Sequence, residues 1–183
     1  MYFYKGGAQF VRWGKSACPD DDTELVYEGF GADGYYNSYG TGVNFLCLPR
    51  DPIFGSNYTG TSYAQVLGAE YDSDAAFFGT RDGDNLPCAV CRSHSSVTNM
   101  MLPGRNKCYQ NWRKQYNGYL ATSSSGSPAS KDYICIDENP DALVAGGHND
   151  NGALFYSVVT KCGALACPPY HEGSRLTCVV CTK

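Results

Sequence analysis

The chain of 183 residues contains 10 cysteines, 15 tyrosines and 21 glycines and carries a formal net charge of −4. This charge and the lack of a basic run argue against nucleic acid and anionic membranes as partners, and no stretch approaches the ~20 apolar residues of a transmembrane helix. The plentiful aromatic and turn residues predict an all-β fold of short strands joined by many turns. Ten cysteines predict a secreted, extracellular protein stabilised by five disulfides.

Residues 1–7 stand outside the internal repeat that makes up the rest of the chain. They begin with an aromatic triplet, Tyr2, Phe3 and Tyr4, which two glycines follow. Such a β-prone segment either frays in solvent or adds to a sheet edge or groove of a neighbouring copy. The segment lacks the apolar centre of a signal peptide, so we expect a mature chain from which an export signal has been removed.

The repeat is about 90 residues long and is defined by four cysteines. The matching cysteines, 88 to 90 residues apart, are Cys18 and Cys108, Cys47 and Cys135, Cys88 and Cys178, and Cys91 and Cys181. The flanking sequence agrees, since Tyr27-Glu28-Gly29 matches Tyr116-Asn117-Gly118 and Gly68-Ala69 resembles Gly152-Ala153. We therefore predict two homologous β subdomains, 8–95 and 96–183, which pack together around a pseudo-two-fold axis.

Within each unit, short apolar runs alternate with turns. Residues 45–48 and 133–136 are such runs and predict strands with both faces covered. Residues 29–42 contain five glycines and three tyrosines and predict a long surface loop. A helical turn is expected only near residues 62–67.

The Cys-x-x-Cys pairs leave a zinc site as an alternative to disulfides. Both gaps hold apolar residues, Ala89-Val90 and Val179-Val180, which are typical of a buried strand, and no histidine stands at ligand spacing from a pair. Disulfides are therefore favoured, and no metal or cofactor is expected. Calcium remains an alternative at the acidic turns 20–22 and 82–85, which offer oxygen ligands, although solvated turns explain the same residues.

No motif for catalysis stands out, because the cysteines divide evenly into pairs and no serine lies in a Gly-x-Ser-x-Gly motif. We therefore expect no enzyme activity. Asn57-Tyr58-Thr59 is an acceptor for N-linked glycosylation and predicts a glycoprotein. Trp13 and the Gly/Tyr-rich residues 29–39 are candidates for stacking on sugar rings, which makes a lectin-like carbohydrate-binding domain the alternative function.

Four phrases spread over most of the chain are FVRWG at 10–14, NFLCLP at 44–49, LPCAVC at 86–91 and CPPY at 167–170. With the order of the cysteines, they resemble the C-terminal noncollagenous domains of spongin-type short-chain collagens and, more distantly, that of type IV collagen. Spacing alone leaves the disulfide connectivity open. The resemblance implies nested pairs: Cys18–Cys91, Cys47–Cys88, Cys108–Cys181, Cys135–Cys178 and Cys162–Cys167. No Gly-X-Y repeat is present, so the chain is expected to be the globular module without a collagen helix.

These features predict a structural module of the extracellular matrix or of an extracellular fibre. Its expected partners are copies of itself, joined by the N-terminal aromatic segment, with glycans or matrix proteins as further partners.

Overall fold

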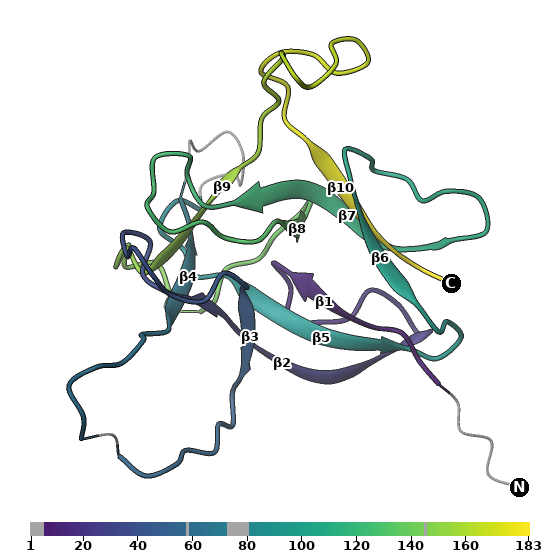
Figure 1. Ribbon diagram of the computed structural model, residues 1–183. Helices are drawn as coiled ribbons and strands as arrows, with labels where there is room; N and C mark the ends of the chain where they lie inside the picture. Colours follow the sequence, from purple (N-terminus) through teal and green to yellow (C-terminus); the bar gives the residue numbers. More distant parts are fainter. Residues whose placement is uncertain (1–5, 58, 73–80, 145) are drawn as a thin grey trace, which may run out of the picture.

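The computed structural model describes residues 6–57, 59–72, 81–144 and 146–183. These residues form ten strands and no helix, which confirms the predicted all-β class (Figure 1). The described part of the chain accordingly has no helix that could cross a membrane.

The strands of the first half pair in a pattern that the second half repeats. The first half contains β1 (Gln9–Trp13), β2 (Thr23–Asp33), β3 (Leu46–Pro49), β4 (Leu67–Tyr71) and β5 (Pro87–Ser93). The second half contains β6 (Asn99–Pro103), β7 (Arg113–Thr122), β8 (Ile134–Asp137), β9 (Ala153–Ser157) and β10 (Thr177–Thr182). β5 lies antiparallel between β1 and β2, and β2 also pairs with β3 and β4. In the same way, β10 lies between β6 and β7, and β7 also pairs with β8 and β9.

Two parallel contacts join the halves into one ten-stranded sheet. β1 meets β8 at Trp13 and Ile136, and β4 pairs with β9 over three residues. The main core cluster is shared as well, since Trp13, Tyr71 and Leu86 of the first half pack with Ile136 and Phe155 of the second. The two units therefore form one hydrophobic core rather than two separate domains.

All ten cysteines are paired in five disulfides. The bridges are Cys18–Cys91, Cys47–Cys88, Cys108–Cys181, Cys135–Cys178 and Cys162–Cys167. These are the pairs that the resemblance to the noncollagenous domains implied, and they leave no cysteine to bind zinc. Each half holds two nested bridges anchored on its central strand, β5 or β10, and removal of such a bridge typically costs about 2–5 kcal/mol.

Three local expectations were wrong. The first five residues of the predicted loop 29–42 belong to β2, because β3 pairs with them. Residues 62–66 form no helical turn, and β4 begins directly after them. Both faces of β8 are buried as predicted, but β3 is open on one face, where Leu46 is 43% exposed.

A buried ion pair fixes the end of β2 against the second half. The Lys131 ammonium lies 3.0 Å from the Asp33 carboxylate and also donates to the Thr41 hydroxyl and the Gly42 carbonyl, at 3.1 and 3.2 Å. The two charged side chains are only 2% and 1% exposed. Burial raises the pKa of Asp33, whose second carboxylate oxygen has no hydrogen-bond partner.

Candidate docking site between repeated units

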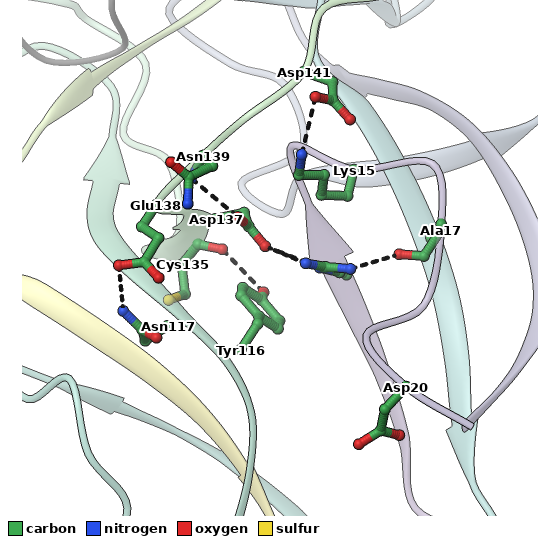
Figure 2. Close-up of polar contacts among 12 residues, drawn as sticks. Lys15, Ala17, Asp20, Tyr116, Asn117, Cys135, Asp137, Glu138, Asn139 and Asp141 are labelled. Carbon is green, nitrogen blue, oxygen red and sulfur yellow. Dashed lines mark hydrogen bonds and ion pairs between the residues drawn. The ribbon is translucent and has the colours of Figure 1, made fainter. Parts of the chain in front are cut away.

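The connection from β8 to β9, residues 138–152, crosses to the first half of the molecule. Asp141 lies at the point of crossing, where its amide donates to the Gly14 carbonyl at 2.7 Å and its carboxylate accepts from Lys15 at 2.9 Å (Figure 2). The Tyr71 hydroxyl donates to the Asp141 carbonyl at 2.8 Å. Burial raises the pKa of Tyr71, so the hydroxyl keeps the proton that this bond needs.

Later residues of the same connection bond to the turn before β5. The Leu143 amide donates to the Asn85 carbonyl at 3.1 Å, and the Asn85 amide donates to the Gly146 carbonyl at 2.9 Å. The Asn149 amide donates to the Gly83 carbonyl at 3.4 Å. Backbone groups make all three of these bonds, so they do not depend on which side chains the connection carries.

The start of β9 then completes the contact with β4. Ala153, Leu154 and Phe155 run parallel to residues 69–71. The buried Glu70 carboxylate accepts the two preceding amides, those of residues 151 and 152, at 3.0 and 3.3 Å. We call residues 138–144 and 146–155 the donor segment, because from Asp141 onward they make these contacts with the first half.

A polar cluster stabilises the same junction near β1 and β8. The Arg12 guanidinium binds the Asp137 carboxylate at 2.7 and 2.9 Å and donates to the Ala17 carbonyl at 3.1 Å (Figure 2). The Tyr116 hydroxyl donates to the carbonyls of Val11 and Cys135, each at 2.9 Å. These carbonyls belong to different halves, so the hydroxyl links the two halves. Burial raises the pKa of Tyr116, which keeps that proton in place.

Hydrogen bonds show which residues of the two halves are structurally equivalent. The Tyr71 amide donates to the carbonyl of residue 84, and the Gly83 amide donates to the Tyr71 carbonyl; Thr160 makes the same pair of bonds with Ser174 and Gly173. Tyr71 is therefore the counterpart of Thr160, 89 residues later. The match of Gly68-Ala69 with Gly152-Ala153 was wrong, because β4 (Leu67–Tyr71) corresponds to residues 156–160.

With this alignment, the counterpart of the donor segment is the stretch between β3 and β4. We call residues 50–57 and 59–66 the arm. Every described residue in it is exposed, including Ile53 at 100% and Phe54 at 84%. The arm loops away from the sheets, below β3 in the view of Figure 1. The described residues of the arm therefore do not repeat the contacts of the donor segment, and the predicted pseudo-two-fold packing is not confirmed.

The second half has a cavity where the first half holds the donor segment. Its volume is about 440 Å³, and five of its lining residues are Gly104, Arg105, Thr160, Ser174 and Arg175. These are the counterparts of Gly14, Lys15, Tyr71, Asp84 and Asn85, most of which bond to the donor segment in the first half. The second half thus has an acceptor surface in the same place, and no residue of the arm lines it.

None of the other predicted site residues within the described chain lines this cavity. Trp13 is only 8% exposed and packs edge-on against Phe45, so little of its ring is available for stacking on a sugar. Asn57 is exposed on the arm. Tyr2, Phe3 and Tyr4 lie outside the described residues.

The two acidic turns considered for calcium have other partners. Asp20 and Asp22 bind Arg113 at 2.7 and 2.9 Å, and Asp84 faces Arg81 at 3.8 Å. The hydroxyl of Ser95 donates to Asp22 and lowers the pKa of its carboxyl. Among the described residues, no three histidine, cysteine or acidic side chains gather in a way that could hold a metal ion.

Neither protein-family models nor curated proteins match the chain. The resemblance to noncollagenous domains therefore stays a prediction based on the quoted motifs.

Proposed function

We propose that the protein is a non-enzymatic structural module of an extracellular matrix or fibre, and that it self-associates head to tail. The proposal rests on one observation, which is that two structurally equivalent segments make different contacts. The donor segment of the second half fills the acceptor surface of the first, whereas the arm and the cavity, their counterparts, do not meet within the chain. The arm of one copy entering the cavity of the next would repeat the internal junction between molecules.

Burial of apolar side chains supplies the driving force for this joint. Ile53 and Phe54 are almost fully exposed, and burying such a side chain yields about 1.5–3 kcal/mol. Leu46 and Leu48 on the open face of β3 are also partly exposed, whereas their counterparts Ile134 and Ile136 are buried against the first half. A neighbouring copy that covers β3 as β1 covers β8 would bury this second patch.

The joint is heterologous, because an arm and a cavity are different surfaces. Such contacts form a closed ring if the rotation between copies closes, and an open filament if it does not. Five disulfides are consistent with an extracellular location. They would also keep each copy folded in a durable assembly.

Complementation between two defective variants tests this joint. We expect Phe54→Asp to disable the arm and Ser174→Trp to fill the cavity, so that each variant alone stays monomeric. An equimolar mixture should form dimers and nothing larger, because one intact arm and one intact cavity remain. Mass photometry of the secreted, non-reduced protein measures the outcome.

Val97→Asp is the matched control, since Val97 is 80% exposed and lies outside both the arm and the cavity. It should assemble as the unmodified protein does. An unmodified protein that stays monomeric over the whole concentration range would contradict self-association. Full assembly of Phe54→Asp would contradict the arm as the donor.

Docking of the N-terminal segment on a neighbour remains a second proposed contact. Deleting residues 2–5 in the same assay separates the two contacts, since the arm and the cavity are left intact. Loss of assembly would assign a role to the aromatic triplet, and unchanged assembly would remove it from the proposal.

A further inference from the structure

The arm carries the N-glycosylation acceptor of the chain at the level where the donor segment packs on the turn before β5. The offset between equivalent residues is 88 at Cys47 and Cys135, before the arm, and 89 at Tyr71 and Thr160, after it. Asn57 therefore corresponds to a position within one residue of Gly146. Its side chain is exposed, and Thr59 completes the acceptor motif.

In the internal junction the donor segment is close-packed at Gly146. The Gly146 carbonyl accepts the Asn85 amide at 2.9 Å, and a Cβ added to Gly146 would lie 2.9 Å from the Asn85 Cβ. A Cβ on the next residue, Gly147, would lie 2.8 Å from the Asp84 carboxylate. The middle of the donor segment thus packs directly on the turn before β5, and the arm would meet the matching turn at Ser174 and Arg175.

We propose that Asn57 is N-glycosylated and that its glycan and the docking of the arm exclude each other. This inference rests on the proposed self-association. The glycan is far larger than the cavity of about 440 Å³, and it would stand on the middle of the arm, at the level of this close packing. A glycosylated copy can still accept an arm in its own cavity but cannot donate one.

The modification needs a lipid-pyrophosphate-linked oligosaccharide as co-reactant. The Asn57 amide nitrogen forms a bond to C1 of the first sugar, the bond from C1 to the pyrophosphate oxygen breaks, and the amide gives up one proton as the lipid pyrophosphate leaves. Full exposure of the arm on a soluble monomer presents the amide to the transferase before assembly. Glycan occupancy would then set the fraction of copies able to extend an assembly.

The test compares the secreted protein with Thr59→Ala, which keeps Asn57 but removes the acceptor motif. Intact-mass spectrometry measures occupancy, and mass photometry measures assembly. We expect glycosylated protein to need at least about a tenfold higher concentration than Thr59→Ala for half-maximal assembly. Thr59→Ala combined with Ser125→Asn and Pro128→Ala moves the acceptor to residue 125, which is exposed, and removes the proline that would disfavour glycan transfer there; this variant should assemble as Thr59→Ala does.

The outcomes separate this inference from the proposed function. Equal assembly of the glycosylated protein and Thr59→Ala, or no glycan on Asn57, would overturn the inference alone. Inhibition of assembly to the same extent by the glycan at residue 125 would also overturn it, since a glycan outside the arm would then have the same effect. Failure of Thr59→Ala to assemble at any concentration would overturn the self-association itself.

Discussion

Replacing Lys131 with methionine is expected to lower the free energy of unfolding by about 3–5 kcal/mol, the usual cost of breaking a buried ion pair on one side. The substitution removes three hydrogen bonds and leaves the Asp33 carboxylate, 1% exposed, without its cation. Chemical denaturation of the non-reduced protein measures the loss. Lys161→Met is the matched control, because its pair with Glu172 is exposed and should contribute less than about 1 kcal/mol.

The pH dependence of the Lys131→Met variant gives a second test. Burial raises the pKa of Asp33 in the folded protein, so the folded state binds a proton more readily than the unfolded chain does. Stability contributed by this group therefore rises as the pH falls through the folded-state pKa. Lys131 opposes this effect and lowers the pKa of Asp33, so in Lys131→Met that pKa rises further and the variant gains more from protonation than the unmodified protein does. The deficit of Lys131→Met should therefore shrink as the pH falls, and a deficit independent of pH would contradict an origin in the stranded carboxylate.

Replacing Gly118 with valine is expected to destabilise the protein by more than about 4 kcal/mol, at the extreme of single-residue effects. A Cβ on Gly118 would lie 1.7 Å from the Ile136 carbonyl oxygen, so β7 and β8 would have to separate. That separation would disturb the Cys135–Cys178 bridge and the shared core around Ile136. Secretion yield and chemical denaturation measure the effect.

Gly126→Val is the control for this prediction. Gly126 lies in a loop, where the nearest atom to an added Cβ is 3.9 Å away, and its replacement should change stability by less than about 0.5 kcal/mol. Near-normal stability of Gly118→Val would show that the two strands can move apart at little cost.

The repeat in the sequence predicted much of this fold because its most clearly matched residues, the glycines and cysteines, are each required by the structure. The matched glycines of Tyr27-Glu28-Gly29 and Tyr116-Asn117-Gly118 both face a backbone carbonyl, that of Leu48 or Ile136, at a distance that no Cβ tolerates. The matched cysteines anchor equivalent bridges on β5 and β10. Covalent bonds and close backbone contacts constrain single residues, and such residues are visible in one sequence.

The docking site was missed because it depends on contacts between distant segments. Beyond Asp51-Pro52 and Asn139-Pro140, the arm and the donor segment share no side-chain pattern, since backbone groups make most of the bonds to Gly14, Gly83 and Asn85. Short pairs of small residues also recur by chance, which is why Gly68-Ala69 was matched with the wrong residues. The adjacent apolar pair Ile53 and Phe54, in an otherwise polar loop, was the one signal available.

The contact of the donor segment with the first half has a consequence for the proposed assembly. A unit standing alone would own both a donor and an acceptor, so half-length units could meet one another in the same way. In the two-unit chain every second joint would be intramolecular, where the effective concentration of the partner is in the millimolar range or above. Joints of two strengths would therefore alternate along the assembly, and dilution is expected to release whole chains rather than half-length pieces.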